Sequence, residues 1–203
     1  MLVSALAAAS GVPVPTIKYY LREGLLPPGR ATGATRAEYG EEHVRRLRLV
    51  RALTEVGGLP IARVRQVLAC LADTTPLLVA LGTAHDALAG PVTTQPPAVG
   101  LQAAATLVAD AGWRVDPDCT SLTQLGAALA ALEGAGLPVD PAALQRYVRA
   151  ADDVARDEVA AVPGGDAADA VEFAVLGTVL HEPVLLALRR LAQQHHSAVR
   201  FGS

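Results

Sequence analysis

The chain of 203 residues predicts a mainly α-helical protein. Alanine and leucine, the strongest helix formers, are abundant, whereas aromatic residues make up only 3% of the chain and β-branched runs are scarce. Apolar residues account for 51%, which is enough to form real cores in one large or two small domains. We therefore expect a helical protein whose stretches of non-helical composition mark its turns and linkers.

Charge is distributed unevenly along the chain. The net charge is −3, yet residues 1–70 hold ten Lys and Arg against five Asp and Glu, while the remainder holds seven against fifteen. A basic N-terminal module joined to an acidic C-terminal one indicates that only the first meets a polyanion such as nucleic acid.

The positions of the cysteines and the length of the apolar runs indicate the cellular compartment of the protein and whether it has disulfides or a metal site. The two cysteines, Cys70 and Cys119, lie far apart, and neither has a second Cys or a His at ligand spacing. Residues 1–9 are apolar but lack the positive segment of a signal peptide, and no uncharged apolar run reaches membrane-spanning length. We expect a cytoplasmic protein with no disulfide framework, no metal or cofactor and no membrane partner.

Two short helices joined by a tight turn are predicted at the N-terminus. Residues 4–10 form an alanine-rich helix, and Gly11 provides the turn. Pro15 suits the first position of the next helix, because its φ is already helical and its missing N–H would be unpaired there. Gly24 can end that helix in the left-handed conformation. Ile17 and Leu21, four residues apart, form its inward face.

The other positions of this second helix carry hydroxyl and cationic groups that can reach base edges and phosphate oxygens. They are Thr16, Lys18, Tyr19, Tyr20 and Arg22. The tyrosine pair could instead belong to the core. Because adjacent helical positions point about 100° apart, we expect at least one of the two to lean outward and contact DNA.

Residues 27–40 predict a hairpin-like excursion, because a Pro-Pro pair and three glycines oppose a helix. Arg30 and Arg36 can reach phosphates from this segment, and the Tyr39 hydroxyl can donate a hydrogen bond to the same backbone.

The segment T-I-K-Y-Y-L-R-E-G-L-L at residues 16–26, followed by a basic wing, resembles the recognition helix of the MerR family of bacterial transcription regulators. The resemblance covers about the first seventy residues. It implies a winged helix-turn-helix with a small β wing. It also implies a homodimer that binds promoter DNA and distorts it for RNA polymerase, at a deformation cost of a few kcal/mol.

The sequence departs from the family pattern at three points. Leu21 stands where many members carry Glu. Lys18 keeps the charge of the commoner Arg but loses its bidentate reading of guanine. The wing ends in Arg36-Ala37-Glu38-Tyr39, one residue longer than the family's Arg-x-Tyr.

Two further helices, residues 41–56 and 60–71, complete a predicted DNA-binding domain at residues 1–71. Apolar residues face inward on both helices. The first leaves four arginines outside, which either form a solvated face or contact phosphates: Arg45, Arg46, Arg48 and Arg51.

A dimerisation helix is expected at residues 73–90, where a Thr-Thr-Pro start precedes a continuous apolar stripe. In the resemblance this helix pairs antiparallel with its partner's copy through Leu77, Leu81 and Leu88. It is shorter than the family's usual coiled coil, so the C-terminal domain is expected to contribute to the dimer.

After a linker at residues 91–100, an all-α domain is predicted at residues 101–203. Its helices are expected at residues 101–111, 122–134, 141–162, 167–180 and 183–195. The third has the clearest buried stripe, made by Leu144, Tyr147, Val148, Ala151, Val154 and Ala155.

This domain is longer than dimerisation requires, and its inward faces are rich in Ala, Leu and Val, so we expect it to bind a small, largely apolar organic effector. The candidate effector residues are Trp113, Tyr147, Glu158 and Phe173. The aromatic residues could equally be ordinary core, and Glu158 a surface residue. His195 and His196 do not share a helix face, which argues against a metal site.

Two rival functions stay open. The protein could be a ligand-independent architectural or developmental DNA-binding protein, which a missing effector pocket would favour. It could also be an enzyme fused to a DNA-binding head. The sequence carries no recognisable nucleophile, base and acid spacing and no phosphate loop, so we expect no enzyme.

Overall fold

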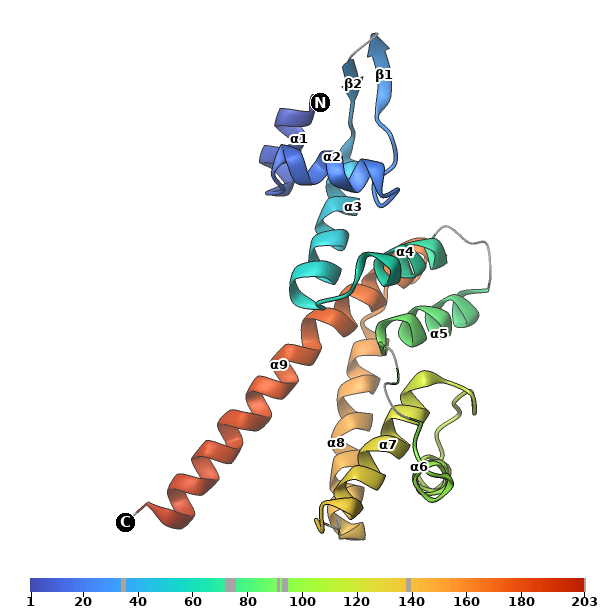
Figure 1. The fold of residues 1–203 in the computed structure, drawn as a ribbon, viewed down its shortest axis with the longest axis vertical. Coiled ribbons are helices and arrows are strands. Elements are labelled where there is room, and N and C mark those ends of the chain that lie inside the picture. Colours follow the sequence, from blue (N-terminus) through green and yellow to red (C-terminus); the bar gives the residue numbers. More distant parts are fainter. Residues whose placement is uncertain (34–35, 72–75, 91, 93–94, 138–139, 203) are drawn as a thin grey trace.

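The computed structural model describes residues 1–33, 36–71, 76–90, 92, 95–137 and 140–202. It confirms a mainly α-helical protein with one two-stranded sheet among these residues. The molecule is elongated (Figure 1): the N-terminal head lies at one end, α4 and α5 lie in the middle, and the remaining helices extend away from them.

The head contains the predicted helix-turn-helix and wing. Its elements are α1 (Val3–Ser10), α2 (Val14–Arg22), β1 (Arg30–Gly33), β2 (Arg36–Glu38), α3 (Glu41–Arg51) with a π-helical continuation η1 (Ala52–Val56), and α4 (Ile61–Cys70). Gly11 and Gly24 have φ of 71° and 70°, which explains why glycine ends both α1 and α2. The second helix begins at Val14, so Pro15 occupies its second position and not the first.

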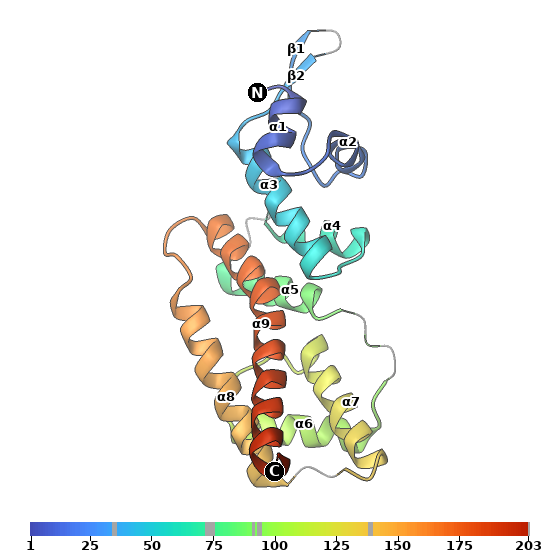
Figure 2. The same cartoon turned by 90° about the vertical axis from the view of Figure 1, so that its left-hand side faces the viewer.

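The rest of the chain forms five helices within the described residues: α5 (Leu77–Leu88), α6 (Ala98–Asp110), α7 (Thr120–Gly134), α8 (Pro141–Ala160) and α9 (Ala167–Phe201). The linker is shorter than expected, because α6 begins at Ala98. The predicted cap of the dimerisation helix at residues 73–75 lies outside the described residues. α6 and α7 pack on each other (Figure 2), whereas α8 and α9 diverge in Figure 1.

The prediction of two helices separated at Pro183 is wrong, because α9 continues through this proline for 35 residues. A proline inside a helix removes one hydrogen bond and crowds the carbonyl four residues earlier. The helix is held before the proline by burial of Val175 and Val179 and by a cap at its start, where Asp166 Oδ1 accepts the Ala168 N–H at 2.8 Å. This packing overrides the local signal.

One hydrophobic core joins the head to the first half of α9. Val171, Val175 and Val179 belong to the same buried cluster as the side chains of α2, α3 and α4. A Cβ added at Gly57 after η1 would lie 3.0 Å from Val179 Cγ1, so the Val179 side chain packs directly on the backbone at Gly57. The first half of α9 therefore packs with the head, whereas α6, α7, α8 and the second half of α9 lie outside this core.

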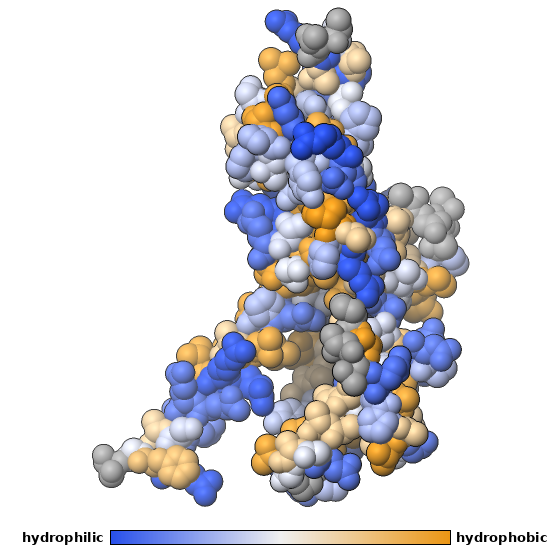
Figure 3. Space-filling model, viewed as in Figure 1, coloured by the Kyte–Doolittle hydropathy of each residue, from blue (hydrophilic) through white to orange (hydrophobic). Residues whose placement is uncertain are grey.

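The second half of α9 leaves this core and projects away from the molecule (Figure 3). Within the described residues α9 is long and apolar enough to cross a membrane, with a window of mean hydropathy 1.6 that is 17% buried. The expectation from the sequence considered only uncharged apolar runs. It therefore did not identify this helix, because Glu172 and Glu182 interrupt its apolar stretch.

The predicted buried stripe of α8 is mostly exposed. Only Val148 is buried, while Tyr147 and Val154 are 57% and 37% exposed. The periodicity predicts an apolar face, but α8 and α9 diverge in Figure 1, and the described residues leave most of that face exposed.

A close approach of two glycines makes the α6–α7 pair testable. A Cβ at Gly100 would lie 2.5 Å from the Gly126 carbonyl oxygen. Gly100→Ala should therefore force the helices apart and lower the free energy of unfolding by about 1–3 kcal/mol. Gly82→Ala in α5 has nothing within 4 Å and should raise it by about 0.5–1 kcal/mol. Urea denaturation measures both, and equal effects of the two variants would contradict the close packing.

Candidate nucleic-acid interface

The second helix of the head presents a cationic face anchored by a buried one. Ile17 is fully buried and Tyr20 is 7% exposed, and both belong to the core. Lys18, Tyr19 and Arg22 are exposed, while Thr16 is half-buried. Of the tyrosine pair, Tyr19 therefore leans outward at 37% exposure, and the expectation that Tyr20 lies on the polar face is corrected.

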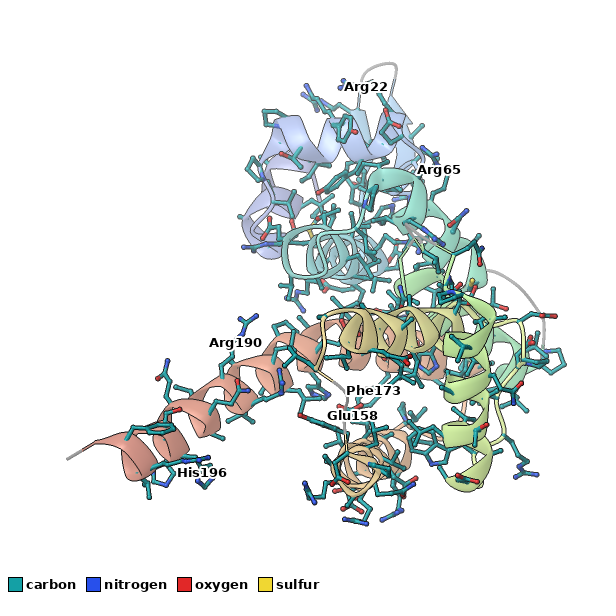
Figure 4. All side chains as sticks on the ribbon, turned by 60° about the horizontal axis from the view of Figure 1, so that its bottom comes forward. Arg22, Arg65, Glu158, Phe173, Arg190 and His196 are labelled. Atoms are coloured by element: carbon teal, nitrogen blue, oxygen red, sulfur yellow. The ribbon has the colours of Figure 1, made fainter. Side chains whose placement is uncertain are left out.

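The end of α2 is held by a residue that sequence reasoning missed. Arg65 on α4 donates two hydrogen bonds to the carbonyl oxygen of Glu23, at 3.1 and 3.3 Å, and pairs with the Glu23 carboxylate at 3.2 Å. A cation at a helix C-terminus satisfies carbonyls that lack an intrahelical partner. Figure 4 shows Arg65 beside α2 and Arg22 at the far end of the head. Arg65 and Glu23 are 42 positions apart in the chain, so no local sequence pattern signals this contact.

The wing is a two-stranded antiparallel ribbon with an irregular register. Arg30 pairs with Glu38 and Gly33 with Arg36, so β1 carries one extra residue between Ala31 and Gly33. Such a bulge increases the local twist of the ribbon. Arg30 lies opposite Glu38, and residues that are paired across two strands share a face. Glu38 and Arg36 are two residues apart on β2 and also share a face, so Arg30 and Arg36 lie on the same face of the wing.

The two wing arginines differ in their surroundings. Arg30 Nη2 pairs with Glu38 Oε2 at 2.5 Å, and both side chains are exposed enough for water to screen them. Arg36 is exposed at the start of β2. A phosphate that approaches Arg30 must therefore compete with the Glu38 carboxylate.

Tyr39 lies at the base of the wing. Its ring packs edge-on against His43 with 5.1 Å between centroids, and a Cβ at Gly29 would fall 2.9 Å from it. Its backbone N–H donates to the Met1 carbonyl at 2.9 Å, and the Met1 ammonium donates to the Tyr39 carbonyl at 2.7 Å. These contacts fix the wing to the N-terminus, a role beyond the hydroxyl contact that the sequence suggested.

The arginines of α3 are largely engaged within the protein. Arg45 pairs with Asp169 at 2.9 Å and Glu172 at 3.4 Å, which ties the head to α9. Burial lowers the pKa of Arg46, and the nearby charge of Glu172 opposes that shift. Arg51 pairs with Glu55 at 2.7 Å. The sequence left two interpretations open for these arginines, a solvated face or contact with phosphates. Arg45 and Arg51 instead form ion pairs within the protein.

The predicted effector residues do not converge on one site. Trp113 Nε1 donates to Asp152 Oδ1 at 2.9 Å, and Tyr147 lines an open groove between α8 and α9. Glu158 Oε1 lies 2.9 Å from His181 Nδ1, so this carboxylate joins α8 to α9. Phe173 is 44% exposed on the first half of α9. Figure 4 shows Glu158 and Phe173 away from the head.

A different groove, of about 870 Å³, lies between α6, α7 and the start of α8. Its walls are mainly apolar and include Leu107, Leu129, Leu132 and Leu144. Five polar side chains also line it: Gln102, Thr106, Asp110, Glu133 and Gln145. No group of three His, Cys, Asp or Glu side chains that could hold a metal occurs in the described part of the chain.

The three leucines of the expected dimerisation helix have mixed surroundings. The most buried residues of α5 are Ala80, Ala84 and Ala87, which join the core of the same chain. Leu81 and Leu88 are partly buried against that core, and Leu77 is 39% exposed. Their place in a subunit interface stays a prediction.

Known proteins share both the head and the whole architecture. The family described as MerR HTH family regulatory protein matches residues 1–70. The HTH-type transcriptional regulator ZntR homolog of Haemophilus influenzae is 44% identical over 50 residues, which are 25% of this chain and 37% of that protein. The crystal structure of SCO5550 from Streptomyces coelicolor A3(2), whose assignment as a transcriptional regulator is provisional, is 38% identical with a TM-score of 0.79. That similarity covers 100% of this chain and 99% of the other.

The winged helix-turn-helix defines the head as a DNA-binding module of a transcription regulator. With a relative that matches along the full length as well, the chain belongs to the MerR family of transcriptional regulators. The chain spans 37% of the length of the Haemophilus regulator, so that protein's own activity is not carried over.

Lys18 offers the most direct test of this interface. It is exposed on α2, so Lys18→Ala should leave the fold intact while it weakens DNA binding more than tenfold. Loss of one phosphate contact should also lower the slope of log affinity against log salt by about one unit. A mobility-shift titration measures both. Arg114→Ala, an exposed cation outside the head, is the control, and equal losses in the two variants would contradict the assignment.

Arg65 should act by positioning α2. Arg65→Ala removes the partner of the Glu23 carbonyl, so the end of α2 should fray and DNA affinity should fall. Arg65→Lys keeps a cation but loses the two-pronged contact and should restore only part of the affinity. Hydrogen exchange supplies the distinguishing readout: faster exchange at Glu23 to Leu25 is expected, and an affinity loss with unchanged exchange would indicate a direct phosphate contact.

Proposed function

We propose that this protein binds promoter DNA as a homodimer and regulates transcription together with RNA polymerase. The observation that carries the proposal is the shared presentation of Lys18, Tyr19 and Arg22 on α2 beside a wing with Arg30 and Arg36 on one face. Helix side chains can reach base edges in the major groove while wing arginines bind phosphates. Tyr20 in the core and Tyr39 at the base of the wing support the position of these groups, and half-buried Thr16 stays a predicted DNA contact.

The dimer would place two such heads on the half-sites of a pseudopalindromic promoter. Distortion of the DNA between the half-sites costs a few kcal/mol, which contacts within the dimer must offset. The first half of α9 is packed into the head core, so a change at the other end of α9 could alter the position of the head. This supports control through the C-terminal helices.

The groove between α6, α7 and α8 is the site that we propose for a small organic effector. Its volume of about 870 Å³ suits a small molecule, and its leucine walls with a few polar anchors are typical of such sites. Tyr147, Trp113, Glu158 and Phe173 line no part of this groove, so their role in effector binding stays a separate prediction.

One observation favours the ligand-independent rival: the groove is open to solvent and is not an enclosed cavity. In that case the C-terminal helices would serve assembly alone. We place the protein in the cytoplasm, without enzymatic activity, because regulators of promoter DNA act there.

Thermal-shift screening separates these two functions. A ligand that binds only the folded state raises the melting temperature, so an apolar organic hit should stabilise the wild type. Leu144→Asn in the groove should abolish the shift, whereas Tyr147→Ala outside it should not. Stabilisation by zinc or copper alone, lost on adding a chelator, would overturn the organic effector. The absence of any hit would favour the architectural rival.

A further inference from the structure

The groove between α6, α7 and the start of α8 has acidic and no basic side chains on its described walls. Asp110 and Glu133 line it, and none of the other described lining residues is Lys, Arg or His. These three helices meet at the end of the molecule opposite the head (Figure 2). The charge that the described residues offer to a ligand is therefore negative, and a complementary ligand carries a positive charge.

Both carboxylates lie near the C-terminal ends of helices. Asp110 is the last residue of α6, and Glu133 is the second-last residue of α7. The negative end of the helix dipole disfavours a carboxylate at such a position. Helix stability therefore explains neither acid, whereas a cation bound beside either of them would be stabilised by the carboxylate and by the helix dipole.

Neither carboxylate of the groove is neutralised within the described part of the protein. Neither forms a hydrogen bond or an ion pair with another described residue. Acids in the last turns of other helices have such partners: Asp86 of α5 accepts the Thr120 N–H at 2.6 Å, and Glu158 Oε1 of α8 lies 2.9 Å from His181 Nδ1. The groove acids are thus free to pair with a ligand.

The rest of the groove fits an aliphatic ligand body. Half-buried leucines from all three helices form much of its walls: Leu107, Leu129, Leu132 and Leu144. The other polar groups are two amides and a hydroxyl that have no hydrogen-bond partner in the described part of the chain: Gln102, Gln145 and Thr106. Amide and hydroxyl oxygens accept hydrogen bonds, so these groups can accept from the N–H donors of a bound cation.

The groove does not have the side chains that bind a quaternary ammonium group. Such a cation has no N–H donor and is normally bound by a cage of aromatic rings. None of the described residues that line the groove is aromatic. A protonated aliphatic amine, in contrast, donates hydrogen bonds that carboxylates accept with the assistance of charge.

We propose that this groove binds a protonated aliphatic amine, whose ammonium group pairs with the carboxylate of Asp110 or Glu133 and whose hydrocarbon body packs against the leucines. The inference rests on the effector groove of the proposed function and deepens it by assigning the chemical class of the ligand. The groove volume of about 870 Å³ lies within the range of small-molecule sites, and its aliphatic walls contact the ligand body without selecting for a ring.

Calorimetric titration of the full chain at neutral pH, where an aliphatic amine is protonated, tests the inference. Three probes share the length of their hydrocarbon chain and differ in the head group: octylamine, octyltrimethylammonium and octanoate. Octylamine should bind most tightly, because it combines a positive charge with N–H donors. Equal or tighter binding of octyltrimethylammonium or octanoate would overturn the inference.

Charge-neutral variants locate the ammonium group. Asp110→Asn or Glu133→Gln should weaken octylamine binding about fivefold, through loss of one partly exposed ion pair. Neither change should unfold the protein, because each removes a charge that the helix dipole disfavours. Asp157→Asn is the matched control, since Asp157 is an exposed acid in the last turn of α8 that lies outside the groove. Unchanged affinity in both groove variants, or equal losses in all three, would contradict the inference.

Two combinations of results separate this inference from the proposed function. If octylamine does not bind, and a neutral or anionic compound binds the wild type but not Leu144→Asn, the groove keeps its proposed effector role and the inference is wrong. If octylamine binds and a mobility-shift titration shows unchanged DNA affinity in its presence, the ligand class is supported and control of DNA binding through this groove is contradicted.

Discussion

The rest of the structure depends on the burial of Val171, Val175 and Val179 of α9 in the core of the head. This packing holds the first and last parts of the chain together, and the ion pairs of Arg45 with Asp169 and Glu172 reinforce it at the surface. The second half of α9 continues the same helix through Pro183. A change at the far end of α9 would therefore reach the head along one continuous helix.

The DNA-binding face is held in place by contacts that are not themselves with DNA. Tyr20 and Ile17 anchor one side of α2 in the core, so that Lys18, Tyr19 and Arg22 point outward. Arg65 fixes the end of the helix, and the backbone pairing of Met1 with Tyr39 fixes the wing. Exposed ion pairs add little stability individually, so the main effect of these contacts is to restrict where the cationic groups can lie.

The effector groove that we propose lies between α6, α7 and the start of α8, outside the core that joins α9 to the head. A ligand in that groove would shift α8, and α8 is joined to α9 by the contact between Glu158 and His181. Burial lowers the pKa of nearby His85, while the charge of Glu158 opposes that shift. α5, α8 and α9 thus meet around one carboxylate, which connects the helix that borders the groove to the helix that packs into the head.

The sequence alone determined the helix-turn-helix, the wing and the family, because these depend on local signals: Gly11 and Gly24 at helix ends, the Tyr-Tyr pair and the Pro-Pro of the wing. Exposed cations on α2 could also be predicted, since periodicity separates the two sides of a short helix. Only the tertiary structure decided which tyrosine is buried, that Arg65 supports Glu23, and that α9 passes through Pro183 into the head core. Each of these depends on contacts between residues far apart in the chain, where packing outweighs local preference and leaves no local pattern in the sequence.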